Sequence, residues 1–121
     1  DACFCAGKAY SHAGILGFSG QTMTVVPGVT ACYRCVFGEA PPEDAVPSCA
    51  QAGVLGSVAG VVGAVQATEA IKYVLGAGDL LTDCLLTYDA LAMRFRKIPL
   101  QLNANCVLCG DGSGGSSPIQ T

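Results

Sequence analysis

The chain has 121 residues and a mass of 12.2 kDa, with 51% apolar and 12% charged residues, a composition that supports one hydrophobic core and argues against intrinsic disorder. Six basic and nine acidic residues give a sequence pI near 4.8, and the scattered cations argue against nucleic acid as a partner. The longest apolar stretch, residues 50–68, contains four glycines and is interrupted by Ser57 and Gln66, which argues against membrane insertion. Because the N-terminus also lacks a signal-peptide pattern, we expect a cytoplasmic protein.

The predicted elements begin with a short helical segment and two strands. Residues 2–10 are rich in small side chains and are expected to be the last turns of a helix that starts upstream. Residues 13–16 and 21–26 have the pattern of strands, separated by a turn at residues 17–20. The Pro-Gly dipeptide at residues 27–28 ends the second strand.

A long loop is predicted over residues 30–51. Three prolines, Pro41, Pro42 and Pro47, exclude regular structure there, and the acidic residues of the loop indicate contact with solvent. Loops of this length are uncommon in compact domains and often carry function.

A helix is predicted over residues 57–75. Ser57 is expected to cap its N-terminus, and Gly76 is expected to end it. Because two glycines lie in its first half, the helix must be stabilised by burial and not by intrinsic propensity. The apolar face predicted to be buried consists of Val58, Val61, Val62, Val65, Ala70 and Ile71.

Two further strands are predicted at residues 80–88 and 94–102, joined by a turn at residues 89–92. Pro99 indicates that the last strand lies at a sheet edge. Residues 111–121 are rich in Gly and Ser and are predicted to be a flexible tail. The fold class expected from these elements is α/β, with a mixed sheet and one long packed helix.

Four of the eight cysteines form two Cys-x-x-Cys pairs, Cys32–Cys35 and Cys106–Cys109. Two such pairs make a closed, tetrahedral four-cysteine zinc site, which is structural because no coordination position stays open. The pairs are about 70 residues apart, far beyond the spacing of a zinc ribbon, so the metal would clamp the long loop to the end of the chain. The alternative is one or two redox disulfides.

The other cysteines and the single histidine give weaker signals. Cys49 lies at the end of the long loop, shortly before a helix N-terminus, where a thiol can become more acidic and reactive; a catalytic and a structural role both stay open. Cys84 lies among leucines, as a small core residue does. Cys3 and Cys5 carry no readable role, and His12 is expected to be an ordinary polar residue near a strand end.

Four charged residues surround the last predicted turn. Asp89 is expected to cap that turn, although it could also bind a partner. Arg94, Arg96 and Lys97 are expected to form a solvated face, and the alternative is that they meet an acidic partner surface.

Several motifs in order resemble one family. They are PG-x-x-x-CYRCVF, PSCAQAGVLG, QATEAIKYVLG, LLTYDAL and CVLCG, and the resemblance extends from residue 1 to about residue 110. Together they are similar to the ThiF/MoeB/HesA family, the ubiquitin-activating-like adenylyltransferases of sulfur-carrier pathways.

The resemblance implies an activity, partners and site residues. Family members use Mg-ATP to adenylate the C-terminal glycine of a ubiquitin-fold sulfur-carrier protein, in thiamine, molybdopterin or related biosynthesis, and they are homodimers. Cys49 falls on the family's thioester or persulfide cysteine, although other members keep a cysteine there without needing it. The residues that fall on the family's structural zinc ligands are Cys32, Cys35, Cys106 and Cys109.

One departure from the family pattern bears on activity. The family's phosphate loop, its ATP-binding arginine and lysine and its magnesium-binding aspartate lie N-terminal to the residues present, and no G-x-G-x-x-G follows a predicted strand. Since the chain also lacks an initiator Met, we expect residues 1–110 to be the C-terminal portion of a Rossmann-like adenylyltransferase domain, inactive by itself. The alternative is a stand-alone zinc-stabilised module that binds a ubiquitin-like protein without catalysis.

Overall fold

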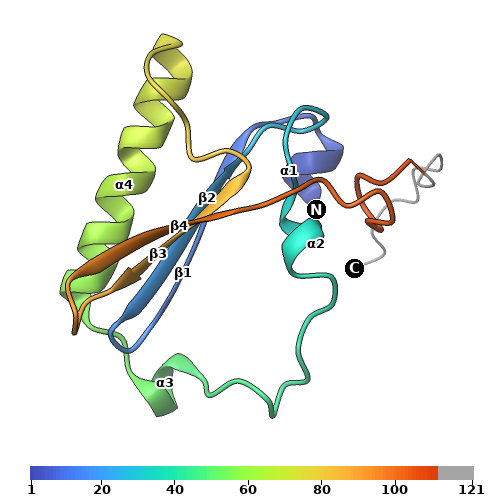
Figure 1. The fold of residues 1–121 in the computed structure, drawn as a ribbon. Coiled ribbons are helices and arrows are strands. Elements are labelled where there is room, and N and C mark those ends of the chain that lie inside the picture. Colours follow the sequence, from blue (N-terminus) through green and yellow to red (C-terminus); the bar gives the residue numbers. More distant parts are fainter. Residues whose placement is uncertain (112–121) are drawn as a thin grey trace.

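The computed structural model describes residues 1–111. The α/β class is confirmed, and the element order is shown in Figure 1. The predicted tail lies outside the described residues from residue 112 onward. The elements are α1 (Ala2–Cys5), β1 (Tyr10–Leu16), β2 (Ser19–Val25), α2 (Tyr33–Val36), α3 (Cys49–Ala52), α4 (Gly56–Leu75), β3 (Cys84–Asp89) and β4 (Arg94–Pro99).

The four strands form one sheet in the order β1-β2-β3-β4, which places β4 at an edge as Pro99 predicted. Each neighbouring pair is antiparallel. The described sheet is therefore antiparallel, whereas the sequence analysis predicted a mixed sheet. Its two hairpins impose antiparallel pairing, and the chain that crosses over through α4 brings β3 beside β2 in the opposite direction. The one parallel contact among the described residues is the isolated bridge between Gly17 and Val54.

Helix α4 packs on one face of the sheet, over β1 and β2. Val58 and Val62 are buried there together with Tyr88. A Cβ atom on Gly20 would lie 2.6 Å from Cγ2 of Val62, so the close approach of helix and sheet depends on the missing side chain. Gly76 ends the helix as predicted, with φ of 63° in the left-handed region.

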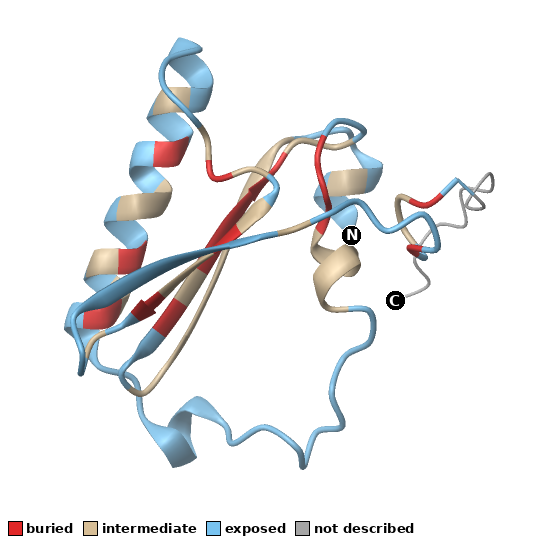
Figure 2. Cartoon of the chain, in the orientation of Figure 1, coloured by how far each residue is buried: buried red, intermediate tan, exposed pale blue. Residues whose placement is uncertain are grey.

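The predicted start and buried face of this helix are partly wrong. The helix begins at Gly56, one residue before the predicted start. Ser57 therefore lies in its first turn and is not the N-cap residue. Ala70 and Ile71 are exposed because the C-terminal half of α4 extends past the sheet (Figure 2). The side chain that continues the buried face is Glu69, which accepts hydrogen bonds from Thr24 Oγ1 at 2.8 Å and from the Leu81 amide at 2.6 Å.

Helix α4 is also, among the described residues, the one helix long and apolar enough to cross a membrane. Length and composition are weak evidence here, because the core helix of a soluble protein meets the same criteria. Val58 and Val62 pack against the sheet and Glu69 makes buried hydrogen bonds, but only 17% of the apolar window is buried, so most of α4 is exposed in the described chain.

The N-terminal segment differs from the prediction. Helix α1 has only four residues, and Tyr10 already belongs to β1. Gly7, with φ of 64°, turns the chain out of the helix and into the strand.

The second core lies on the opposite face of the sheet. Its buried residues are Met23, Val25, Cys32, Leu85 and Cys106. Since two of these are cysteines of the predicted metal site, that site is built into the core and is not attached to the surface.

Candidate metal centre and the loop that it anchors

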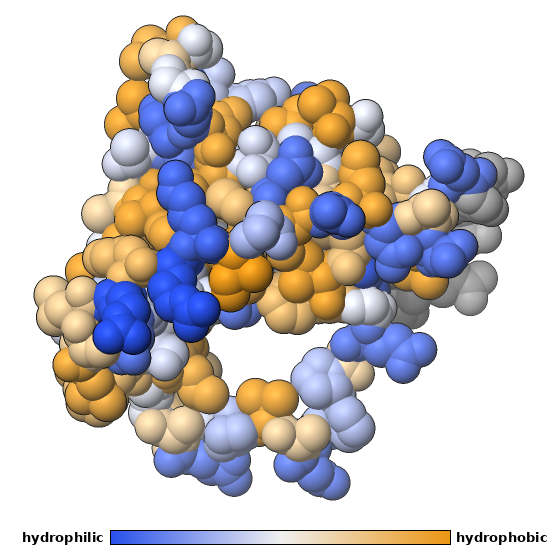
Figure 3. All heavy atoms as spheres, viewed as in Figure 1, coloured by the Kyte–Doolittle hydropathy of each residue, from blue (hydrophilic) through white to orange (hydrophobic). Residues whose placement is uncertain are grey.

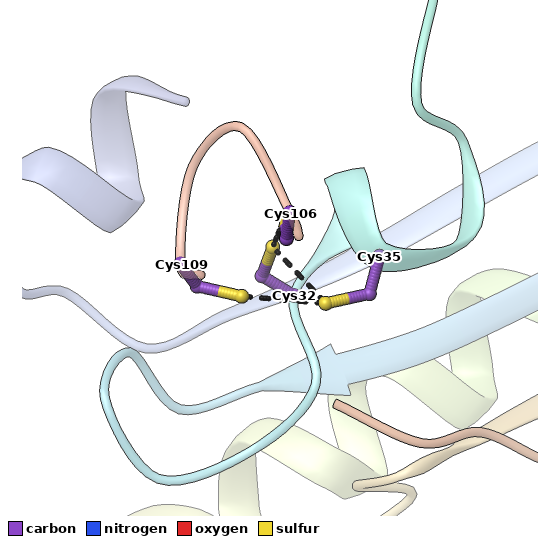
Figure 4. A group of neighbouring side chains, drawn as sticks. All are labelled: Cys32, Cys35, Cys106 and Cys109. Carbon is purple, nitrogen blue, oxygen red and sulfur yellow. Dashed lines mark hydrogen bonds between the residues drawn. The ribbon is translucent and has the colours of Figure 1, made fainter. Parts of the chain in front are cut away.

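The two Cys-x-x-Cys pairs meet in space. Cys32 is the N-cap residue of α2 and Cys35 lies within this helix, while Cys106 and Cys109 lie in the turns that follow β4. The sulfur atoms are 3.8 Å apart for Cys32 and Cys35, 3.6 Å for Cys32 and Cys106, and 3.3 Å for Cys35 and Cys109 (Figure 4). All four lie within 4.8 Å of one another.

This geometry fits a metal better than a disulfide. All eight cysteines are free thiols, and the sulfur separations far exceed the roughly 2.05 Å of an S–S bond. A tetrahedral zinc ion with Zn–S bonds of about 2.3 Å would hold its four sulfurs about 3.8 Å apart. The separations found are close to that value, so the donor set and its spacing suit zinc.

The surroundings of the cluster prepare one thiol for ionisation. Burial raises the pKa of Cys32 and of Cys109. Burial also opposes ionisation of Cys106, but the backbone N–H groups of Cys109 and Leu108 together with the Cys109 and Cys32 thiols lower the pKa of Cys106 to about 7. The Leu108 amide donates to the Cys106 sulfur at 3.5 Å. Amide donors of this kind stabilise a thiolate, the form in which cysteine binds metals.

Gly110, directly after the second pair, closes the turn. Its amide donates to the Cys106 carbonyl at 3.0 Å. A Cβ atom at this position would lie 2.4 Å from the Ala104 carbonyl oxygen, so the turn accepts only glycine. Sequence reasoning did not single out Gly110, although a glycine that directly follows Cys-x-x-Cys was an available signal.

Asp83, the residue directly before β3, holds both segments that carry the cluster cysteines. Its carboxylate accepts a hydrogen bond from the Ala31 amide, next to Cys32, at 2.7 Å. Its carbonyl accepts one from the Leu100 amide, on the way to Cys106, at 2.8 Å. Asp83 adopts a φ of 52°, which Asp tolerates better than most residues. No sequence pattern marked this residue.

Residues 37–52, which we name the arch, leave the cluster and cross to the other end of the sheet. The far end of the arch is fixed at the β1–β2 turn, where Gly17 donates to the Gly53 carbonyl at 3.0 Å and accepts from the Leu55 amide at 3.3 Å. Figure 3 shows an opening between the arch and the body of the molecule. The arch is therefore held at two points, and from residue 38 onward it is exposed.

The predicted loop is not without regular structure, because α2 and α3 both lie within residues 30–52. A capping box stabilises the N-terminus of α3. Ser48 Oγ accepts a hydrogen bond from the Gln51 amide at 3.3 Å, and the Gln51 side chain accepts one from the Ser48 amide at 3.1 Å. Cys49 is the exposed first residue of α3. The structure thus places Cys49 near the Gly17 end of the arch and apart from the four-cysteine cluster.

A concave surface of about 560 Å³ lies on the sheet face opposite α4, at the end that carries the β1–β2 turn. Arg94 and Arg96 line it, and strand alternation turns the exposed Lys97 to the other face. Asp89 also lines it and caps the following turn as predicted, with its carboxylate accepting from the Leu91 and Ala92 amides at 3.0 and 3.2 Å. The other lining residues are Gly14, Ile15, Leu16, Ser19, Gly20, Gln21, Thr87 and Tyr88.

The remaining residues singled out in the sequence lie elsewhere. His12 is in β1 with its ring edge-on to Tyr33 at 4.6 Å, and burial lowers its pKa. Cys84 is half-buried at the start of β3, and burial raises its pKa. Cys3 and Cys5 are exposed on α1.

Comparison with known proteins decides the family. The model of the ThiF family matches residues 1–108. The chain belongs to the ThiF family. It is 46% identical over 112 residues to the SAMP-activating enzyme E1 of Haloferax volcanii and 44% identical over 116 residues to the sulfur carrier protein adenylyltransferase of Thermus thermophilus. These matches cover 93% and 92% of the chain but only 41% and 43% of those relatives.

Solved structures support the fold of this ThiF family member. Crystal structures of Escherichia coli MccB share 19% sequence identity with the chain, and the one with MccA-N7isoASN superposes with a TM-score of 0.75. That match covers 91% of the chain and 36% of MccB. The chain therefore shares the fold of about a third of MccB.

Proposed function

We propose that residues 1–110 form the C-terminal portion of an enzyme that adenylates the C-terminal glycine of a ubiquitin-fold sulfur-carrier protein with ATP. The observation that carries the proposal is the match, along nearly the whole chain, to relatives named as a SAMP-activating enzyme and a sulfur carrier protein adenylyltransferase. Thiamine, molybdopterin or related biosynthesis is the pathway class that such an activity serves.

The residues present do not fit the binding of Mg-ATP. Among residues 1–111, no glycine-rich phosphate loop follows a strand, so no contact with the nucleotide is assigned to these residues. We expect an upstream half to supply those groups, and we expect the 121 residues alone to be inactive in adenylation.

The four-cysteine cluster is proposed to hold one structural zinc ion. Cys32 and Cys35 would bind it from α2 and its N-cap, directly before the arch begins. Cys106 and Cys109 would bind it from the segment after β4. A metal with four protein ligands has no open position for substrate. Its contribution is a cross-link that fixes one end of the arch against the sheet.

The carrier is proposed to lie on the sheet face opposite α4, with its extended C-terminal tail beneath the arch. The concave surface there offers two exposed arginines, Arg94 and Arg96, to acidic groups of the carrier. Complementary charge of this kind steers association and fixes register. The opening under the arch in Figure 3 gives an extended segment a passage.

Cys49 is the proposed acceptor of the activated carrier. Its thiolate would attack the carbonyl carbon of the acyl-adenylate, so that a C–S bond forms, the C–O bond to AMP breaks and AMP leaves. The exposure of Cys49 at the start of α3, near the Gly17 end of the arch, supports this role. As the family resemblance implies, we further propose a homodimer that acts in the cytoplasm without membrane insertion.

An ATP–pyrophosphate exchange assay tests the proposal. A longer protein that joins an upstream nucleotide-binding half to this chain should exchange pyrophosphate in the presence of a ubiquitin-fold carrier, while the 121-residue chain should not. Clear exchange by the isolated chain would contradict the assignment of residues 1–110 as a portion of the domain.

A binding module without catalysis is the second candidate function. The specific observation in its favour is that residues 1–111 offer a concave surface lined by two arginines, while none of the strands among them is followed by a phosphate loop. The same assay separates the two functions. If this chain is only a binding module, the longer protein should bind the carrier but exchange no pyrophosphate.

A further inference from the structure

A row of four residues crosses the whole sheet on the face opposite α4. Strand register pairs Gly14 of β1 with Gln21 of β2. It also pairs Gln21 with Thr87 of β3, and Thr87 with Arg96 of β4. All four residues line the concave surface described above. Because neighbouring strands lie about 4.8 Å apart, the row is about 14 Å long, which is the length of about four extended residues.

Gly14 occupies a strand position where the fold does not require glycine. Its φ is not positive. A Cβ atom there would meet only Cγ and Nε2 of Gln21, each at 3.7 Å, which is an ordinary van der Waals contact. Glycine in a strand interior weakens the strand, and it often marks a position where another backbone approaches closely. The missing side chain therefore leaves room on the concave surface itself.

The row also offers polar groups that are available to a ligand. Within residues 1–111, the Gln21 carboxamide and the Arg96 guanidinium make no hydrogen bond or ion pair. A carboxamide both donates and accepts, which matches the N–H and C=O groups of a peptide main chain. A guanidinium binds carboxylates. The Asp89 carboxylate on the same surface is already engaged by two backbone amides, those of Leu91 and Ala92.

The arch is held at two points along β1. The ring of Phe37, the first residue of the arch, lies 6.5 Å from the ring of His12. The far end of the arch is fixed at Gly17, directly after β1. Gly14 lies between His12 and Gly17 in the chain. An extended segment that crosses the sheet from Arg96 to Gly14 is thus directed toward the opening under the arch (Figure 3).

We propose that Gly14 and Gln21 are specificity-determining residues, which select an extended peptide segment with an acidic side chain about four residues before the peptide group that lies on Gly14. Arg96 binds the acidic side chain, and Gln21 pairs with the main chain. The occupant is the C-terminal tail of the carrier, so the inference rests on the proposed function. It adds a pair of residues that recognise the tail by its backbone.

The test is an NMR titration of the isotope-labelled full chain with two acetylated peptides. The long peptide has one glutamate followed by six serines, and the short peptide has one glutamate followed by a single serine. Since only the long peptide can reach from Arg96 to Gly14, Gln21→Met should weaken its binding by about 3- to 10-fold and leave the short peptide unchanged. Gln101→Met, at an exposed glutamine after β4, is the matched control and should bind both peptides as the wild type does.

The variant Gly14→Ala separates a role in binding from a role in folding. Urea denaturation should show a stability equal to or above that of the wild type, while the long peptide should bind at least about threefold more weakly because the new methyl group holds its backbone away. Gly60→Ala, at an exposed glycine of α4 with open space around it, should leave peptide binding unchanged. Wild-type affinity of Gly14→Ala for the long peptide would overturn the inference, as would a loss of stability in this variant.

Replacing the glutamate of the long peptide by glutamine tests the charged end of the row. The affinity of the wild-type chain should fall by about 2- to 5-fold, and Arg96→Gln should abolish the difference between the two peptides. An equal effect of Gln21→Met on the long and the short peptide would overturn the inference. Peptide binding needs no nucleotide, so its failure leaves pyrophosphate exchange by the longer protein as independent support for the proposed function. Failure of exchange with binding retained would instead show that the occupant assigned here is wrong.

Discussion

The two ends of the arch are held in different ways. At one end, Cys32 is fully buried and Cys106 is 5% exposed, and the backbone before and after the cluster is fixed by Asp83 and Gly110. At the other end, two backbone hydrogen bonds to Gly17 and one isolated bridge hold exposed residues. One end of the arch is therefore built into the core, whereas the end near Cys49 can separate from the sheet at the cost of a few exposed contacts.

The largest effect is expected from removing the metal that anchors the buried end of the arch. Cys32→Ser should lose the zinc ion and destabilise the chain by about 4 kcal/mol, the value for a cross-link that closes a loop of about 70 residues. Metal content by mass spectrometry and urea denaturation measure this. Cys5→Ser, exposed on α1, is the control, and a metal-free wild type of equal stability would contradict the prediction.

A smaller effect is expected from crowding the turn that carries Cys109. Gly110→Ala places a methyl group against the Ala104 carbonyl and should cost about 1–3 kcal/mol of unfolding free energy together with zinc affinity. Gly38→Ala in the arch is the matched control, because a Cβ atom there meets nothing within 4 Å. Equal thermal stability of the two variants would show that the turn is not the constraint described above.

The Asp83 contacts can be separated by three substitutions. Asp83→Asn keeps an acceptor for the Ala31 amide and should be nearly neutral, whereas Asp83→Gly loses the acceptor but suits the positive φ. Asp83→Ala loses the acceptor for the Ala31 amide and is also poorly suited to the positive φ. It should therefore be the least stable variant, with an unfolding free energy about 1–2 kcal/mol below that of the wild type. Urea denaturation ranks the variants, and a Gly variant as unstable as Ala would assign the whole effect to the lost hydrogen bond.

The smallest effect on stability is expected at the loosely held end. Cys49→Ala changes an exposed side chain and should alter the unfolding free energy by less than about 0.5 kcal/mol. In a longer protein with the nucleotide-binding half, it should keep pyrophosphate exchange and fail to form a carrier adduct that thiol reagents cleave. Cys3→Ala is the control, and normal sulfur transfer by Cys49→Ala would leave Cys49 with a structural role alone.

Much of this architecture is predictable from local sequence signals. Turn glycines and the proline of β4 locate the hairpins and the sheet edge, because they restrict the backbone wherever they occur. The cysteine pairs predict the cluster, since two ligands per pair need only a short turn each. These signals act within a few residues and do not depend on the rest of the fold.

The features that sequence reasoning missed depend on contacts between distant segments. The burial of Glu69 is set by where α4 leaves the sheet and by donors on Thr24 and Leu81. Asp83 acts through amides that are about 50 and 20 residues away from it in the chain, a pairing that no local pattern encodes. The direction of β3 likewise follows from the whole crossover and not from the strand itself.

The opening under the arch has a topological consequence. The strap is closed at both ends while the contacts of Gly17 with Gly53 and Leu55 hold, so a chain terminus enters as one segment, whereas an internal loop of another protein must enter folded back on itself as two segments side by side. A flexible chain terminus, one extended residue wide, can pass. A closed strap would then favour a terminus over a loop by the width that each needs, without recognition of side chains.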